Sequence, residues 1–475
     1  MENIDNNNNN RRSFLKRLGM ASVGFAGLPL ISSSLIGCKD DKIKSENGGF
    51  EKNAHSNIVV RKNIADIAVD DAEIKLFKDA VGILKKRSQI SPLDPMGWQA
   101  NAFLHTTFCA TSMYSNQVHY NWYVWPWHRL YLWSLEQKLQ KAVSEPKLAL
   151  HYWDWTKSNF IPEHYWGDES NPLFNASRFV GPNDKIPNDF INVGAGFRTK
   201  DYKTFGGYPA IKKYGDAQLD GMAEQSFHNN IHNWIGGQMA TFVESGFEPI
   251  FYGHHGNCDR IWDAWLAYST ENKLPDSEEW LEKKLYATDG NGRPVDFKIK
   301  ELLNTEDLGY RFADLDLNPT FCNPYNEEDK PKRNESKKDC IASLNLKTSD
   351  TNSIIKDFAD KERSHVILHF ERAQLPYQPY CARVFFEYMM DGRKQSKYTG
   401  TFTILPILDI DSVLLQNGVF LQIEIEKEIA QAVDQKIKID VIFQPVPLPN
   451  RNIPDEILKL ENISIYKDYE NRNSH

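Results

Sequence analysis

The spacing of apolar residues predicts that the first part of this 475-residue chain is mainly helical. From Ala72 to Ser88, apolar side chains recur three and four residues apart, which predicts an amphipathic helix. Leucines between Leu130 and Leu139 follow the same spacing. Because proline is tolerated in the first turn of a helix, that helix is expected to begin near Pro126. Two more helices are expected, from Leu219 to Trp234 and from about His254 to Ser269.

In the last quarter of the chain, apolar residues recur every second position instead of every third or fourth. Four segments there alternate or are rich in β-branched and aromatic residues: Arg383–Met390, Thr399–Leu405, Val419–Ile425 and Lys436–Phe443. This pattern predicts a sandwich or a small barrel. The predicted fold is therefore a mainly α core, an antiparallel four-helix bundle with long loops, followed by a C-terminal all-β, sandwich-like domain.

These changes of pattern also predict boundaries. The expected parts are a targeting segment (1–38), a polar tether (39–62), the helical core (63–277), a small element after it (278–322), a charged linker (323–350), the β domain (351–448) and a tail (449–475).

The first forty residues have the pattern of an export signal. Arg11-Arg12-Ser13-Phe14-Leu15-Lys16 resembles a bacterial twin-arginine signal, and a mildly apolar stretch follows it. The stretch ends in Leu35-Ile36-Gly37-Cys38, which resembles a lipoprotein processing site. We therefore expect export, lipidation of Cys38, and a periplasmic or membrane-anchored lipoprotein. A plain cleaved signal peptide and an uncut anchor remain open.

The charge, apolar stretches and cysteines of the chain limit its possible binding partners and disulfides. The formal net charge is −8 and no long basic run occurs, which disfavours a nucleic-acid partner. No later stretch has the 18 or so apolar residues of a membrane span, so membrane contact is expected only through a lipid at Cys38. Of the five other cysteines, Cys322 and Cys340 flank a polar segment and could pair. The oligomeric state stays open.

Six of the 13 histidines form two groups of three, which we call the first and second trios. The first trio is His105, His119 and His128, and the second is His228, His232 and His255.

Spacing predicts that the two trios are assembled differently. His228 and His232 are four residues apart and share one face of a helix, whereas His255 comes from the next helix. His119 and His128 are nine residues apart, about two and a half helical turns, so His119 is expected on a loop. His105 is expected at the end of an earlier helix.

The chemistry of the trios favours a pair of copper ions. Di-iron sites in helical bundles use glutamate ligands, and structural zinc sites usually include cysteine. Neutral imidazole is a common ligand of copper, and three imidazoles for each of two metals fit copper best. Asp259, one turn after His255, is placed to orient an imidazole through a hydrogen bond. His365 and His369 lie in a β-like segment and are not expected to share a metal.

Two long motifs resemble those of a known family. Val118–Leu132, with the core His119-Tyr120-Asn121-Trp122, resembles the first copper motif of tyrosinases and plant-type polyphenol oxidases. Pro249–Trp262, which contains His254-His255-Gly256-Asn257, resembles the second, and Ala149–Trp155 fits the strand between them. The resemblance extends over residues 60 to 446. In place of the second residue of a family tyrosine pair stands Phe312, which leaves Tyr310.

The resemblance implies roles for particular residues. The first trio would bind one copper and the second trio the other, without His254. Cys109, four residues after His105, would form a thioether with His119; the alternative is a buried free thiol. Phe242 would gate the second copper; the alternative is an ordinary core phenylalanine.

Two polar residues beside the second trio complete the implied site. By the resemblance, Glu224 and Asn229 hold a water that helps to deprotonate a phenol. The alternative for Glu224 is a carboxylate at the positive end of a helix dipole.

The implied function is copper-dependent oxidation of phenols by O2. Monophenols would be hydroxylated at the ortho position, and o-diphenols (catechols) would be oxidised to o-quinones, with O2 and small phenols as partners. The implied fold also has the C-terminal β domain shielding the site. Two alternatives remain open: a type-3 copper oxygen carrier without turnover, like hemocyanin, and a zinc or metal-free module.

Overall fold

The computed structural model describes ten stretches of the chain. They are 58–110, 118–119, 121–209, 220–317, 330–334, 339–345, 363–371, 379–405, 419–453 and 462–466. The predicted export signal, Cys38 and Cys322 lie outside these residues, so export, lipidation and the pairing of Cys322 with Cys340 stay predictions. Within the described part, no helix combines the length and apolar character that crossing a membrane requires.

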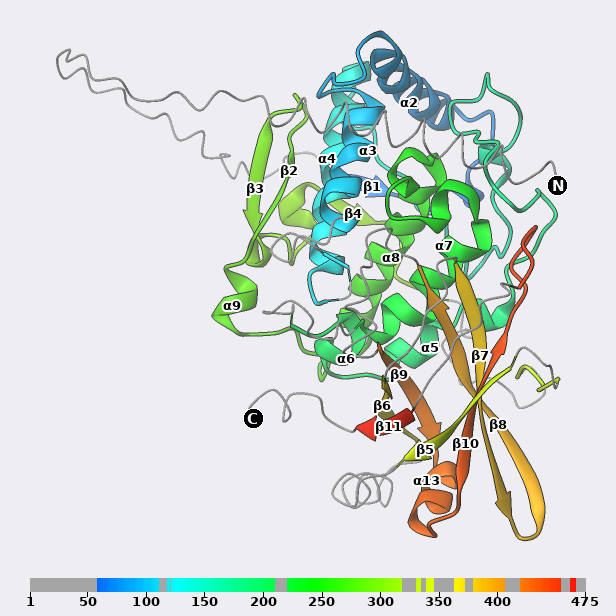
Figure 1. Cartoon of the computed structure of the whole chain (residues 1–475). Helices are drawn as coiled ribbons and strands as arrows, with labels where there is room; N and C mark the ends of the chain where they lie inside the picture. The colour runs from blue at the N-terminus through cyan, green and yellow to red at the C-terminus, as the bar shows by residue number, and fades with distance from the viewer. Residues whose placement is uncertain are drawn as a thin grey trace, which may run out of the picture. The chain divides into compact units, whose positions relative to one another are not determined.

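Four long helices form the core, drawn in blue to green in Figure 1. They are α2 (Ala72–Ile90), α3 (Trp98–Cys109), α4 (Val124–Val143) and α8 (Pro249–Tyr268). The start of α2 is fixed by Asp71, whose side chain accepts a hydrogen bond from the Glu73 backbone N–H. The start of α8 lies about five residues before the predicted one, because Glu248 caps it and Pro249 occupies the first turn.

The predicted helix from Leu219 to Trp234 is shorter in the structure and has two parts. A π-helical turn, η4 (Glu224–His228), continues into α7 (Asn229–Ile235). Short helices also occur between α4 and η4, where the sequence predicted long loops. The remaining helical segments are η1 (Ile64–Asp66), η2 (Glu163–Tyr165), η3 (Asn188–Phe190), α5 (Val193–Phe197), α6 (Tyr202–Gly206), η5 (Gly237–Ala240), η6 (Ser245–Phe247), α9 (Glu278–Leu281), η7 (Ile299–Glu301) and η8 (Glu306–Leu308).

Two small sheets border the core. The hairpin of β2 (Lys284–Thr288) and β3 (Pro294–Lys298) lies within the small element predicted after the core. Strand β1 (Val59–Arg61) pairs in parallel with β4 (Tyr310–Phe312). The predicted tether therefore ends before β1, because a partner strand 251 residues later in the chain supplies the backbone hydrogen bonds.

The C-terminal part is the predicted β region. It comprises β5 (Cys340–Asn345), β6 (Arg363–Glu371), β7 (Tyr380–Met390), β8 (Arg393–Ile404), β9 (Val419–Glu426), α13 (Lys427–Asp434), β10 (Ile439–Pro445) and β11 (Asn462–Tyr466). The strands join in the order β8-β7-β10-β5-β11-β6-β9, and only β5 and β11 pair in parallel. The end strands β8 and β9 also contact each other, so the sheet curls around an apolar interior that includes Leu368, Phe386 and Val441.

Two boundaries of this region differ from the prediction. Strand β5 lies in the predicted linker, and β11 lies in the predicted tail. Both are short and flanked by polar sequence, so neither shows a clear period on its own. Their backbone groups pair with strands far away in the sequence, which only the tertiary structure brings together.

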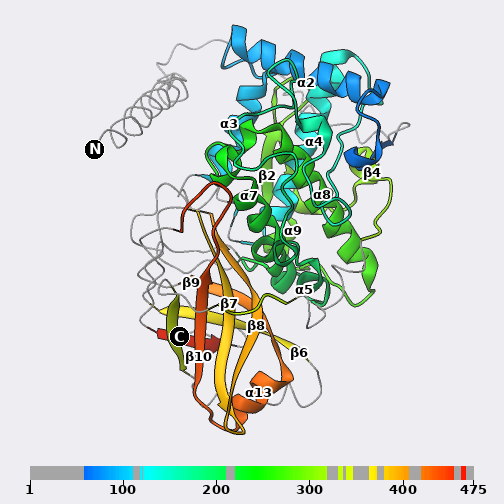
Figure 2. The same ribbon diagram turned by 90° about the vertical axis from the view of Figure 1, so that its right-hand side faces the viewer.

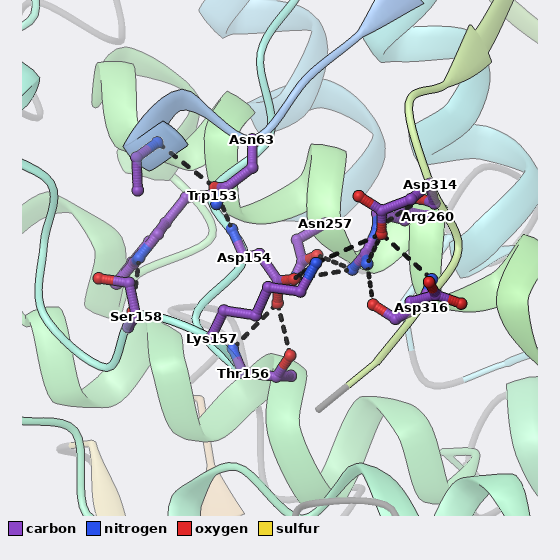
Figure 3. A network of polar contacts seen from close by, with 11 residues as sticks. Asn63, Trp153, Asp154, Thr156, Lys157, Ser158, Asn257, Arg260, Asp314 and Asp316 are labelled. Carbon is purple, nitrogen blue, oxygen red and sulfur yellow. Dashed lines mark hydrogen bonds and ion pairs between the residues drawn. The ribbon is translucent and has the colours of Figure 1, made fainter. Parts of the chain in front are cut away.

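An ion-pair network around the buried Arg260 ties the segment after β4 to the core (Figure 3). Arg260 of α8 lies 3.2 Å from the carboxylate of Asp154 and 2.8 Å from that of Asp314. The side chain of Asn63 in turn accepts a hydrogen bond from the Asp154 backbone N–H at 3.0 Å. One guanidinium therefore holds together the start of the core, the segment between α4 and η2, and the residues that precede the predicted linker.

The β region packs on the core through polar contacts, and Figure 2 shows the strands beside α5 and α7. The guanidinium of Arg383 in β7 lies 2.8 Å from the Asp189 carboxylate, which also accepts a hydrogen bond from Thr401 at 3.0 Å. Arg198 of the core pairs with Glu424 of β9. Strands β7 and β8 also contact α7, and β8 contacts η4.

Candidate metal centre

The first trio is assembled from two helices and a loop, as predicted. His105 lies near the end of α3, His128 in the first turns of α4, and His119 in the loop between them. All three side chains are buried, and their ring centroids lie 5.0 to 6.0 Å apart.

The second trio is tighter. His228 ends the π-helical turn, His232 lies in α7 and His255 in α8. The Nε2 atom of His255 is 3.3 Å from Nε2 of His228 and 3.2 Å from Nε2 of His232. The two trios adjoin, because the rings of His128 and His255 stack with centroids 4.1 Å apart. Six imidazoles therefore enclose one continuous buried site.

Hydrogen bonds to the Nδ1 atoms leave other nitrogens ready to bind metal. Nδ1 faces a backbone carbonyl in His105 (Phe242, 2.9 Å), His128 (Val124, 2.7 Å) and His232 (Met239, 2.8 Å). A carbonyl only accepts, so each Nδ1 must carry the proton and donate it. Each Nε2 then keeps its lone pair, which is the tautomer that a metal requires.

Burial keeps these imidazoles neutral. Loss of solvation lowers the pKa of both His119 and His232 to about 3 and the pKa of His105, His128, His228 and His255 well below the usual range. Buried neutral imidazoles with inward-facing lone pairs fit two copper ions.

His254 lies in the same buried group but is oriented differently. Its Nδ1 accepts a hydrogen bond from the indole N–H of Trp155 at 3.2 Å, and its Nε2 lies 3.8 Å from the sulfur of Cys258. Because Nδ1 accepts, the proton of a neutral ring must be on Nε2. Neither nitrogen then has a lone pair to offer a metal, which agrees with leaving His254 out of the ligands.

Glu224 and Asn229 contact one histidine from each trio. The carboxylate of Glu224 is 2.6 Å from Nδ1 of His119, and the amide oxygen of Asn229 is 2.9 Å from Nδ1 of His228. Both side chains are buried and orient a ligand. The sequence did not predict these orienting contacts, and the water-holding role stays a prediction.

Two other predicted site residues lie beside the first trio. The ring of Phe242 is 4.3 Å from that of His119, and its carbonyl accepts from His105, so its contacts fall on the first trio although a gate over the second copper was expected. The sulfur of Cys109 lies within 4.8 Å of nitrogens of the three first-trio histidines. This proximity suits a thioether to His119, but the gate and the thioether stay predictions.

The prediction for Asp259 was wrong. Its carboxylate holds no imidazole but accepts from Arg129 at 2.6 Å, from Arg61 at 3.3 Å and from the hydroxyl of Tyr310 at 2.6 Å. A buried carboxylate requires cationic partners, and β1 and α4 place two guanidiniums against it. Sequence reasoning missed Arg61 because a lone arginine in a polar segment carries no local signal.

His365 and His369 lie on β6, as the period-two pattern indicated, and the two histidine groups around the trios do not include His369.

Comparison with known proteins connects this geometry to a family. The family model described as the common central domain of tyrosinase matches residues 95–213 and 189–268. Polyphenol oxidase of Vitis vinifera is 29% identical over 308 residues, 56% of this chain and 49% of the relative. (+)-Larreatricin hydroxylase of Larrea tridentata is 25% identical over 397 residues, 71% of this chain and 66% of the relative. The matches span about half to two thirds of the length of these relatives.

Solved structures share the fold. Latent apple tyrosinase superposes with a TM-score of 0.65 at 18% identity, covering 86% of this chain and 97% of that one. A functional unit of octopus hemocyanin superposes with a TM-score of 0.51 at 17% identity, covering 86% and 99%. A helical core followed by a C-terminal β region is thus confirmed as the fold.

Proposed function

Because the chain belongs to the tyrosinase and polyphenol oxidase family of type-3 copper proteins, we propose that it uses O2 to oxidise phenols at two coppers held by the two trios. The observation that carries the proposal is the buried, continuous group of six imidazoles, in which His128 of one trio stacks on His255 of the other. Two coppers so enclosed would supply O2 binding and electron transfer.

The chain's own residues would prepare this chemistry. Carbonyls of Phe242, Val124 and Met239 fix the Nδ1 proton of three ligands, so that none of these three needs to lose a proton when copper binds. The aromatic rings of Phe242 and Phe251 pack against the histidines and keep water from the metals. A phenol that reached the site would meet Glu224 as a buried carboxylate near His119.

Turnover of a catechol tests the proposal. The copper-loaded protein, supplied with 4-methylcatechol and O2, should consume O2 and accumulate the o-quinone, followed by its visible absorbance. Reversible O2 binding without quinone would favour the oxygen-carrier alternative. The fold is compatible with this alternative, because it is also similar to that of a hemocyanin functional unit. Tight binding of zinc with no oxygen chemistry would favour the second alternative, a zinc module.

The finer part of the proposal is that the protein also hydroxylates monophenols, and Glu224→Gln tests it. Glutamine keeps the size of Glu224 and an acceptor for His119 but is not a base. Hydroxylation of a monophenol should fall by about a hundredfold or more, as expected when a general base is lost. Oxidation of a catechol should fall by less than about tenfold, because only the orientation of His119 is perturbed.

Asp220 provides a matched control, because it is a buried carboxyl four residues before Glu224 and just outside the helix. Burial and the charge of Glu224 raise the pKa of Asp220 well above its usual range, which favours the neutral form of this carboxyl. Asp220→Asn should therefore leave both activities nearly unchanged. Equal losses of the two activities in Glu224→Gln would reject the role of Glu224 as a base for monophenols.

A further inference from the structure

The π-helical turn that ends at His228 receives a hydrogen bond from a neighbouring side chain. A π turn widens the helix and disturbs the regular pairing of its carbonyls. Here the side-chain amide of Asn230 donates to the backbone carbonyl of Ser226 at 2.7 Å. Asn230 is fully buried and stands between the ligands His228 and His232. Its side chain therefore braces the turn that positions the first of them.

The amide of Asn230 has a single consistent orientation. Its nitrogen faces two acceptors, the carbonyls of Ser226 and, at 3.5 Å, of Phe190. Its oxygen must then point the other way and requires a donor, because a buried amide oxygen without one is destabilising. The hydroxyl of Thr403 in β8 supplies that hydrogen bond, and Thr403 is itself buried.

Other contacts from the β region end on the same segment. The backbone N–H of Gln422 in β9 donates to the side chain of Gln225 at 2.9 Å. The guanidinium of Arg451, which follows β10, donates to the carbonyl of Asn233, directly after His232. The β region thus holds the segment that carries His228 and His232 at its start, at its middle and near its end.

We propose that Thr403 is a positioning residue for the second copper, acting through Asn230 on the turn that places His228. The proposal rests on the proposed function only in requiring that the second trio binds copper. Without the Thr403 hydroxyl, the buried oxygen of Asn230 loses its donor, and the amide must rotate or shift to find another. Either movement releases the carbonyl of Ser226 and loosens His228 relative to His232 and His255. The β region is then a structural part of the second metal site.

Three variants separate this role from a general effect on folding. Thr403→Val removes the hydroxyl at constant shape, and Thr403→Ser keeps the hydroxyl. Thr401→Val is the matched control: Thr401 lies two residues away on β8, and its hydroxyl reaches Asp189 in η3, which carries no ligand. Far-UV circular dichroism and thermal melting of the metal-free proteins report folding. If Thr403→Val does not fold, Thr403→Ala is measured in the same way.

The readout is copper retained per chain after dialysis against graded chelator concentrations. Wild type, Thr403→Ser and Thr401→Val should retain two coppers over the same range. Thr403→Val should lose one of its two coppers at about 10- to 100-fold lower chelator concentration, the range typical for residues that orient a metal ligand. Retention of both coppers by Thr403→Val at the wild-type range would overturn the proposal, as would an equal loss in Thr401→Val.

Copper retention and catechol oxidation together distinguish a failure of this inference from a failure of the proposed function. If wild type retains two coppers but does not oxidise catechol, the proposed function fails, and the comparison of variants still decides the role of Thr403. If wild type retains fewer than two coppers, both are overturned.

Discussion

Replacing His255 with glutamine should leave one tightly held copper per chain and lower catechol oxidation by more than about a hundredfold, since even residues that only orient a ligand contribute up to that factor. His255 is the centre of the second trio, with its Nε2 atom within 3.3 Å of those of His228 and His232. Its ring also stacks on His128, so it joins the two trios. Copper analysis and quinone formation measure the two effects.

The neighbouring histidine is the matched control. His254 is equally buried and adjacent in sequence, but its Nδ1 accepts from Trp155 and its Nε2 faces Cys258. Glutamine at this position retains an oxygen that can accept from Trp155. His254→Gln should therefore retain two coppers and most of the activity. Loss of a copper in His254→Gln, with two retained in His255→Gln, would exchange the assignments of the two residues.

Asp259→Asn should destabilise the protein by about 3–5 kcal/mol, the usual cost of removing one partner from a buried ion pair. The carboxylate lies between the guanidiniums of Arg129 and Arg61, which are both fully buried. Asparagine fits the space but leaves two buried cations with less compensating charge. Glu136, which pairs with Arg61 at 3.0 Å, compensates only part of it.

Thermal and urea unfolding of the metal-free protein measure this effect separately from copper binding. The exposed ion pair of Lys284 and Asp296 is a control, because both side chains are solvated and such pairs contribute little. Asp296→Asn should unfold close to wild type. If Asp259→Asn did the same, the network that joins β1, α4, α8 and β4 would not be a main source of stability.

Local spacing predicted much of the site. The four-residue interval of His228 and His232 and the nine-residue interval of His119 and His128 indicated which histidines share a helix and which lie on a loop, and the structure confirms both. Periods of 3.6 and 2 likewise located α2, β7, β8, β9 and β10. These patterns are readable because the geometry of a helix or strand repeats over a few residues.

Contacts across the chain were not predictable in this way. Asp259 was assigned to an imidazole one turn away, but its partners are Arg61, 198 residues earlier, and Arg129, 130 residues earlier. Strands β5 and β11 lay in segments read as linker and tail. Asp259 and the two strands each depend on a partner that only the folded chain brings close. The local sequence has no periodic pattern that would identify this partner.

The sequence by itself determined the six histidines, their division into two trios and the order of a helical core followed by a β region, because these follow from short-range spacing and from motifs along the chain. Only the tertiary structure decided which nitrogen of each histidine faces inward, that Asp259 neutralises two arginines, and that Thr403 supports the turn at His228. Those properties depend on hydrogen-bond donors, acceptors and charges that burial forces into pairs, and the pairs form between residues far apart in the chain.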